Sequence, residues 1–285
     1  MTTVDLDRMP VGDAMRLLAG ESRHAFDAFE RAAPLLAPVV EASVAAIRRG
    51  GSVHLFGAGT SGRLAALDAA EVPPTFGVGS EVFVAHLAGG VDAMVQAAED
   101  AEDDGAAGAL AATGLSDRDV AIGVTASGRT PYVLAALAAA RGRGSYTALL
   151  ECNGLDERSD EVDCHVALLT GPEAIAGSTR LNAATAQKLA LNAISTLVMV
   201  GLGRTYSNLM ICVKPSNAKL RRRIAEMLAS ITGARPSDVH AALAAAEWEG
   251  DVALVMLTSG VDARAARERL RVRQSLRDLV ERSDA

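Results

Sequence analysis

The chain has 285 residues, of which 49% are hydrophobic and 22% are charged. This composition excludes global disorder, and the length fits one large domain or a core domain with an appendage. Asp and Glu number 35 against 28 Lys and Arg, and the net charge of −7 argues against a general nucleic-acid binder, which needs a basic surface. The three cysteines lack CxxC spacing, which disfavours a disulfide framework and a Cys-rich metal site.

No segment of the sequence predicts export or membrane insertion. The opening MTTVDLDRMP is acidic and has no apolar signal-peptide core. The longest apolar run, 189–202, is interrupted by Asn192, Ser195 and Thr196 and is shorter than the roughly 20 residues that span a bilayer. We therefore expect a soluble, cytoplasmic protein with no membrane partner.

The order of apolar runs predicts an α/β protein. The first fifty residues read as helix, with a long stretch over 21–49 that Gly50 and Gly51 end. Short strands separated by helices then predict a doubly wound, five-stranded parallel sheet that is covered on both faces. The expected strands are 53–56, 81–87, 120–126, 146–151 and 165–170.

The helices between the strands differ in character. We expect a helix over 63–71, a long acidic helix after the second strand, and a helix over 180–200. After residue 207 the strands fade, and 219–231, 236–247, 251–258 and 262–279 read as helices. This pattern predicts an N-terminal helical segment (1–47), a sheet domain (48–207) and a small helical appendage (208–285).

Three of the expected strands end in clusters of Ser, Thr and Gly that precede a helix: GAGTSGR (57–63), TASGRT (125–130) and AGSTR (176–180). Hydroxyls, free backbone N–H groups and a helix N-terminus together make a phosphate cradle. One such loop can simply cap a helix, but three loops at one sheet edge favour phosphate binding. GAGTSG also matches the dinucleotide pattern, yet no acidic residue ends the second strand to bind a ribose.

Longer stretches around these loops resemble the N-acetylmuramic acid 6-phosphate etherases. The resemblance rests on GAGTSGRLAALDAAEVPPTFG (57–77), ASGRTPYV (126–133) and GSTRLNAATAQKLALNAIST (177–196). It implies the sugar isomerase (SIS) fold with a small C-terminal appendage, which we expect to be UBA-like. It also implies cleavage of the lactyl ether of N-acetylmuramic acid 6-phosphate to N-acetylglucosamine 6-phosphate and D-lactate. A homodimer with the site near the subunit interface is a further implication.

The reaction needs an acid and a base rather than a metal or an organic cofactor. The family's two catalytic glutamates match Glu71, at the end of LDAAE, and Glu102, in AAEDAED. Composition cannot choose between Glu102 and Glu99, three positions earlier in an acidic run that is typical of a solvated face; the resemblance selects Glu102. We assign the C2 proton to Glu102 and the leaving group and incoming water to Glu71. The following VPP sequence predicts that the helix stops there.

The phosphate and substrate contacts are expected in the three loops. Glu173 and His86 are candidate substrate contacts near strand ends, while His54 and His165 are read as core or strand-end residues and Trp248 as packing. The five histidines show no metal-ligand spacing, so no metal or cofactor is expected. The binding residues are Thr60, Ser61, Gly62, Arg63, Ser127, Gly128, Arg129, Thr130, Ser178 and Thr179.

The chain departs from the family's usual pattern in its opening, at Leu181 and Asn182, and at Ala218. Asn182 stands where a cation is usual, so the carboxylate of the substrate is the part whose recognition can differ. Two other functions remain open on the same fold: an aldose–ketose phosphosugar isomerase, and a non-catalytic sugar-phosphate regulator like the glucokinase regulatory protein. Retention of both glutamates favours the enzyme.

Overall fold

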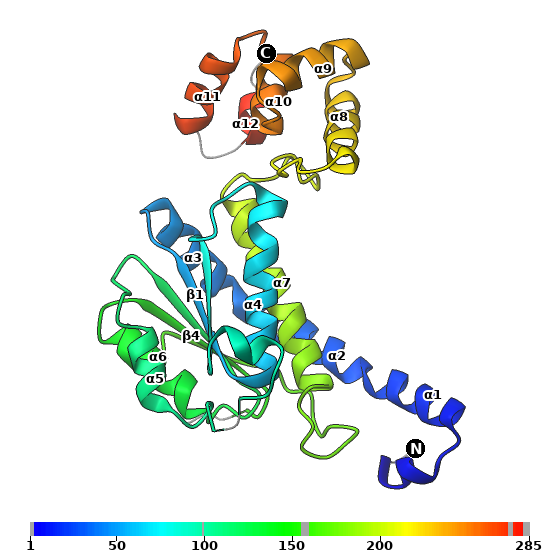
Figure 1. Cartoon of the computed structure of the whole chain (residues 1–285), viewed down its shortest axis with the longest axis vertical. Coiled ribbons are helices and arrows are strands. Elements are labelled where there is room, and N and C mark those ends of the chain that lie inside the picture. Colours follow the sequence, from blue (N-terminus) through cyan, green and yellow to red (C-terminus); the bar gives the residue numbers. More distant parts are fainter. Residues whose placement is uncertain (1–2, 99, 155–159, 273–275, 282–285) are drawn as a thin grey trace. The chain divides into compact units, whose positions relative to one another are not determined.

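The computed structural model describes residues 3–98, 100–154, 160–272 and 276–281, with the side chains of Val272 and Glu281 excepted. The chain forms two compact units (Figure 1). The first comprises Met1–Ala70 and Glu81–Ser195, and the second comprises Glu71–Ser80 and Thr196–Ala285. The expected division at residues 47 and 207 stays a prediction.

A five-stranded, fully parallel sheet forms the centre of the first unit, in the order β2-β1-β3-β4-β5. This confirms the predicted α/β fold with a doubly wound sheet. The connection after β1 leads to β2 on one side, and the connection after β3 leads to β4 on the opposite side. The loops that follow these two neighbouring strands therefore diverge, at the edge where open α/β sheets bind ligands. The strands are β1 (Val53–Gly57), β2 (Phe83–Leu87), β3 (Val120–Val124), β4 (Tyr146–Glu151) and β5 (Cys164–Ala167).

Alternating side chains divide the sheet between two helical layers. Phe56, Ala121 and Leu149 belong to a buried cluster with α5 (Gly105–Ala111) and α6 (Pro131–Arg141). The intervening apolar residues of the same strands are buried as well, and α3 (Ala37–Arg48) covers β1 and β3 on the other side (Figure 1). Burial on both faces explains why the strands read as continuous apolar runs rather than alternating ones.

The N-terminal helix that we expected over 21–49 is divided. The chain forms η1 (Thr3–Arg8), α1 (Val11–Glu21), α2 (Arg23–Ala32) and a 3-10 turn, η2 (Ala33–Leu36), before α3. Pro34 lies at the start of η2 and Pro38 at the start of α3, where a missing backbone N–H is least costly. A continuous helix is therefore replaced by segments that restart at each proline.

The predicted stop after Glu71 is wrong, because α4 runs from Gly59 to Phe76 through Pro73 and Pro74. Both prolines lie in the last turn, and each removes one backbone N–H donor from the helix. Val72 and Phe76 are buried and hold this turn in place. The Pro74 carbonyl accepts a hydrogen bond from the backbone N–H of Lys214 at 3.1 Å.

The long acidic helix expected after β2 is also wrong. Among the described residues between β2 and α5, the chain forms a short 3-10 helix, η3 (Val91–Met94), and Glu102 lies in a turn before α5. Asp100 has a φ of 62°, which interrupts helical geometry, and Asp104 then caps α5 by accepting a hydrogen bond from Ala107 N at 2.8 Å. Glu99 lies outside the described residues.

The second unit is helical around its own core, which includes Ile224, Leu228, Leu243 and Val252. Within the last predicted helix, 262–279, the structure describes α11 (Ala263–Val272) and α12 (Leu276–Glu281), and residues 273–275 lie outside the described residues. A UBA-like arrangement stays a prediction. The preceding helices are α8 (Ala218–Thr232), α9 (Pro236–Ala245) and α10 (Gly250–Ser259).

Among the described residues, α7 (Asn182–Gly201) is the one helix long and apolar enough to cross a membrane on length and composition alone. Such a helix is weak evidence for a membrane span, since the core helices of soluble proteins pass the same test. Its apolar window is 56% buried within the protein, and Gln187 and Asn192 bond to side chains of α4.

Candidate active site

All three predicted loops lie at the carboxyl edge of the sheet and lead into helices. The loop after β1 enters α4, whose first turn contains Thr60 and Ser61. The loop after β3 enters α6, and the segment after β5 enters α7. Three helix N-termini therefore follow the strand ends, as the phosphate-binding hypothesis requires.

The first loop is fixed by close packing. Gly62 is buried, and a Cβ there would lie 2.4 Å from Leu87 Cδ1 and 2.5 Å from the Gly57 carbonyl oxygen, so no larger residue fits. Ser61 Oγ donates to Gln187 Oε1 of α7 at 2.8 Å, and the Gln187 amide lies 3.7 Å from the Cys152 sulfur after β4. Burial raises the pKa of Cys152 to about 12, so this thiol is a neutral packing group.

The second loop is a compact hydroxyl cluster. Thr125 Oγ1 lies 2.7 Å from Thr130 Oγ1 and 3.4 Å from Ser127 Oγ, and Ser127 Oγ accepts from the backbone N–H of Arg129 at 3.1 Å. Gly128 has a φ of +71° and is buried, which allows the sharp turn. Ser127 and Arg129 are exposed, so this loop presents a hydroxyl and a guanidinium to solvent.

The third loop is organised by Glu173. Its two carboxylate oxygens accept from the backbone N–H groups of Asn182, at 2.8 Å, and Ala183, at 2.9 Å, at the start of α7. Glu173 is therefore a helix cap, and its proposed sugar contact stays a prediction. Ser178 and Thr179 lie in the turn just before this helix.

Asn182 carries an unused donor. Its side chain is buried, yet its Nδ2 has no hydrogen-bond partner within the part of the chain that the structure describes. A buried amide without an acceptor is costly. An acceptor oxygen of a ligand would remove that cost.

Glu102 lines a cavity of about 210 Å³ beside the first loop. The carboxylate side chain is exposed, and its own backbone carbonyl accepts from Tyr132 N, at the start of α6, at 3.0 Å. Ala58, Gly59 and Arg63 line the same cavity. The structure thus brings Glu102 together with the loop that follows β1.

Arg63 contacts backbone rather than an acidic side chain. Its Nε donates to the Ala93 carbonyl at 2.8 Å and its Nη2 to the Gln96 carbonyl at 3.1 Å. These two bonds use part of the guanidinium, which has five N–H donors. The expected contact between Arg63 and phosphate or carboxylate stays a prediction.

His86 pairs with His54 across strands β1 and β2. Nδ1 of His54 lies 2.9 Å from Nε2 of His86, and the His86 ring stacks on Phe56 with centroids 4.5 Å apart. Burial, with a smaller contribution from the neighbouring His54, lowers the pKa of His86 to about 4. His86 is therefore a neutral packed ring, and substrate contact stays a prediction.

Glu71 is an exposed residue of α4 in the second unit. One turn earlier on the same helix, Asp68 is buried and accepts from Asn192 Nδ2 at 2.5 Å and Ser195 Oγ at 3.2 Å. Burial raises the pKa of Asp68, while Asn192 and Ser195 act against the rise. These bonds, all within the first unit, fix α4 at Asp68 against α7.

The chain is similar over most of its length to named bacterial proteins. Proteins named N-acetylmuramic acid 6-phosphate etherase from Thermobifida fusca (strain YX) and Serratia proteamaculans (strain 568) are 48% and 43% identical to this chain. The alignments cover 90% and 94% of this chain and 84% and 91% of the relatives. The chain belongs to this etherase family.

The chain also has the SIS-type fold. A model of the glucokinase regulatory protein N-terminal SIS domain matches residues 35–141. A phosphoheptose isomerase structure from Francisella tularensis is 20% identical, with a TM-score of 0.51, over 67% of this chain and 98% of that one. At this identity the likeness concerns the fold alone, and it supports the predicted SIS type.

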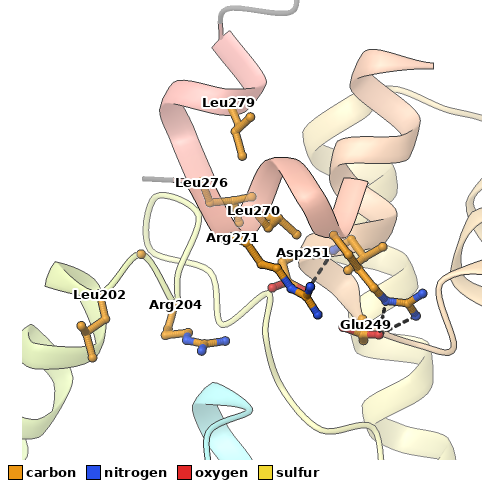
Figure 2. A pocket seen from close by; sticks show the side chains of 11 residues that line it. Leu202, Arg204, Glu249, Asp251, Leu270, Arg271, Leu276 and Leu279 are labelled. Atoms are coloured by element: carbon orange, nitrogen blue, oxygen red, sulfur yellow. Dashed lines mark hydrogen bonds and ion pairs between the residues drawn. The ribbon is translucent and has the colours of Figure 1, made fainter. Parts of the chain in front are cut away.

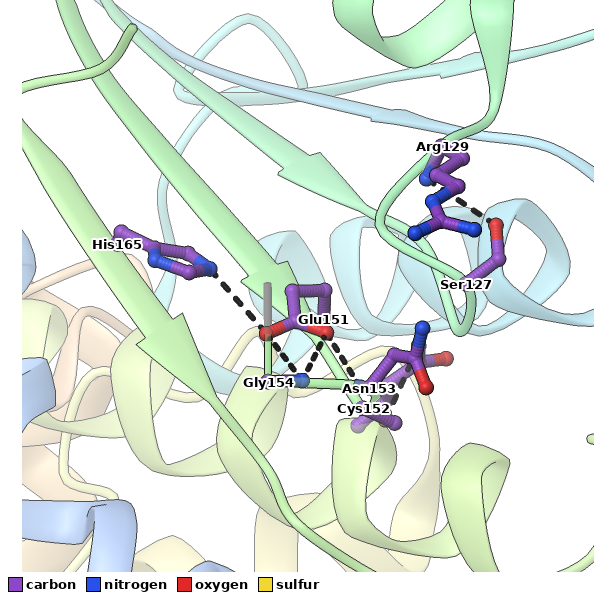
Figure 3. A network of polar contacts seen from close by, with 8 residues as sticks. Ser127, Arg129, Glu151, Cys152, Asn153, Gly154 and His165 are labelled. Atoms are coloured by element: carbon purple, nitrogen blue, oxygen red, sulfur yellow. Dashed lines mark hydrogen bonds and ion pairs between the residues drawn. The ribbon is translucent and has the colours of Figure 1, made fainter. Parts of the chain in front are cut away.

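A buried network that the sequence of this etherase-family chain does not predict lies at the end of β4 (Figure 3). Glu151, at the end of β4, is fully buried and accepts from the backbone N–H groups of Asn153 and of Gly154, the latter at 3.0 Å. His165 Nε2 lies 3.2 Å from Glu151 Oε1. The only signal in the sequence was an acidic residue at the end of an apolar strand.

A larger cavity of about 330 Å³ lies within the second unit (Figure 2). Arg204, Arg267 and Arg271 line it with Glu249 and Asp251. Arg267 is held by Glu249 at 2.6 Å, so part of its charge is already neutralised. None of the predicted site residues lines this cavity.

Proposed function

We infer that the chain is a carbon–oxygen lyase that cleaves the D-lactyl ether of N-acetylmuramic acid 6-phosphate. The products are N-acetylglucosamine 6-phosphate and D-lactate, as in the recycling of cell-wall (peptidoglycan) sugars and amino sugar catabolism. The observation that carries this inference is identity of 41–48% to proteins named as this etherase, over at least 90% of the chain. The phosphosugar isomerase and the regulator on the same fold are not favoured.

The phosphate of the substrate would bind at the three loops. Ser127 and Thr130 offer hydroxyls at the start of α6, and Ser178 and Thr179 do so before α7. Charge-assisted hydrogen bonds to a dianion are about twice as strong as neutral ones, so the phosphate is the main anchor. The Nδ2 of Asn182, which has no partner among the described residues, is suited to a sugar, phosphate or carboxylate oxygen.

Two carboxyl groups would divide the chemistry. In the open-chain aldehyde, Glu102 takes the C2 proton, the C3–O bond breaks, and Glu71 gives its proton to the departing lactate oxygen. Water then adds to C3 of the unsaturated aldehyde while Glu71 takes its proton, and Glu102 returns a proton to C2. The exposed carboxylate of Glu102 beside the first loop supports the first role. No metal or organic cofactor enters these steps.

We expect a homodimer that works in the cytoplasm. Support for association comes from α1, which buries none of its own residues and exposes Val11 and Met15. Support for the cytoplasm is chemical, because a phosphorylated sugar is charged and does not cross a membrane unaided.

Glu71→Gln and Glu102→Gln test the assignment. Each variant keeps size and most hydrogen bonding but cannot exchange a proton, so D-lactate release should fall by about 10²–10⁴-fold. Binding of glucosamine-type 6-phosphates, measured by titration, should persist. Provided that deprotonation is reversible, Glu102→Gln should also lose exchange of the C2 proton with deuterated solvent, while Glu71→Gln keeps some of it.

Glu99→Gln is the matched control from the same acidic run. If Glu99→Gln stops releasing D-lactate while Glu102→Gln releases it at the wild-type rate, the base has been assigned to the wrong residue. Wild-type protein that binds the substrate without releasing D-lactate would instead favour the regulator. Interconversion of aldose and ketose phosphates would favour the isomerase.

A further inference from the structure

Arg63 connects α4, which is packed against its neighbours, to the segment 91–103, whose described residues have few contacts with the rest of the protein. It lies in α4, whose first turns are packed against β1 and α7 through Gly62 and Ser61. Its guanidinium donates to the carbonyls of Ala93, inside η3, and of Gln96, just after η3. A planar guanidinium donates in fixed directions, so two bonds to two carbonyls set its orientation relative to the segment.

The segment that contains Glu102 has few other attachments. Of the described residues in 91–103, only Ala93 is buried. Small side chains provide the rest of its packing: a Cβ at Gly89 would lie 2.6 Å from the Cβ of Ala98 and 3.2 Å from that of Ala93. The far end is fixed where Tyr132 N donates to the Glu102 carbonyl at 3.0 Å.

We propose that Arg63 is a positioning residue for Glu102, fixing the segment 91–103 against α4 so that the carboxylate lies beside the first phosphate loop. Arg63 and Glu102 line the same cavity of about 210 Å³, which places the bridge next to the group that it positions. The inference deepens the proposed function, because it rests on Glu102 as the base. It departs from the expectation that Arg63 acts as an anion ligand.

The two roles of Arg63 predict opposite kinetic effects. A positioning residue changes the turnover step, since a base displaced by about 1 Å can cost on the order of 10²-fold. An anion ligand contributes to substrate binding, so its loss raises KM. Arg63→Met removes the donors but keeps an unbranched side chain, and Arg63→Lys restores the charge without the fork geometry.

For Arg63→Met we expect kcat for D-lactate release to fall about tenfold or more while KM changes less than about threefold. C2 exchange with deuterated solvent should fall in parallel with kcat. Arg63→Lys should recover part of the loss, and exposed Arg143→Met, treated identically, should match the wild type. A tenfold rise in KM at unchanged kcat would identify Arg63 as an anion ligand and overturn the proposal, as would wild-type kinetics in Arg63→Met.

Hydrogen exchange separates failure of the proposal from failure of the proposed function. The N–H group of Ala93 bonds to the Gly90 carbonyl, just before the segment, and those of Val95 and Gln96 bond to the Asp92 carbonyl within it. Their exchange should accelerate in Arg63→Met while that of β1 and β3 stays unchanged. If wild-type protein releases no D-lactate but exchange accelerates in this way, the bridge is real and the reaction assigned to it is wrong. Unchanged exchange means that Arg63 does not hold the segment.

Discussion

Two histidines of the sheet, His54 and His86, make the stability of the fold depend on pH, independently of catalysis. Burial lowers the pKa of His54 as well as that of His86, although Asp119 acts against the shift at His54. The histidine pair is therefore neutral in the folded state at neutral pH. In the unfolded chain both rings would titrate near about 6.5. Below that pH the unfolded state binds more protons than the folded state, so the free energy of unfolding decreases.

Acidification should therefore destabilise the protein in a way that depends on His86. The stability that depends on neutral His86 is fully present above about pH 6.5. It is lost as the pH falls towards about 4, the pKa of His86 in the folded state. Between pH 7 and pH 5 the loss is about 1 kcal/mol for a ring that solvent partly screens. Urea unfolding at both pH values should show a smaller difference for His86→Gln than for the wild type. Exposed His24→Gln should keep the full difference, and an equal change in all three proteins would contradict the assignment.

Among the elements, β4 shows how a strand end can be held by a buried acidic side chain. Glu151 accepts from the backbone of the loop that follows it, and Cys152 N donates to the Ala126 carbonyl after β3 at 3.1 Å. The ends of β3 and β4 are thereby tied together where the Ser127 loop begins (Figure 3). A buried carboxylate is tolerated here because backbone N–H groups and His165 surround it.

Glu151→Gln should weaken this connection. A glutamine has one acceptor oxygen in place of two, and its NH₂ group would face backbone donors. An unsatisfied buried group costs about 1–3 kcal/mol, so the midpoint of guanidinium unfolding should fall. Exposed Glu81→Gln is the control for loss of one negative charge. Equal midpoints for wild type and Glu151→Gln would show that the backbone of the loop does not depend on this carboxylate.

At the scale of the whole molecule, apolar surface on the N-terminal helices supports the proposed homodimer. The side chains of Val11 and Met15 are 79% and 63% exposed, and they lie four residues apart on one face of α1. Phe26 of α2 is 56% exposed. Exposed apolar side chains that recur on one face indicate an interaction surface.

Sedimentation of the wild type should give twice the chain mass at micromolar concentration. Val11→Glu combined with Met15→Glu should shift the protein towards monomer, because each carboxylate would have to be desolvated at the interface. Leu110→Glu alters another exposed apolar residue, on α5, and should leave the mass unchanged. A monomeric wild type would exclude the homodimer, and a dimer insensitive to the α1 changes would exclude α1 from its interface.

The sequence alone determined the α/β class, the five strands and the three Ser/Thr/Gly loops, because short buried runs and the residues that end them are local signals. The tertiary structure decided features that depend on residues far apart in the chain. The burial of Val72 and Phe76 stabilises the part of α4 that continues past Pro73. The left-handed backbone conformation of Asp100 and the helix cap at Asp104 give a turn in place of the expected acidic helix. No local pattern predicts that Arg63 meets the carbonyl of Ala93, 30 residues on, or that Glu151 meets His165. Such contacts arise when parallel strands and their helices bring distant segments to one edge.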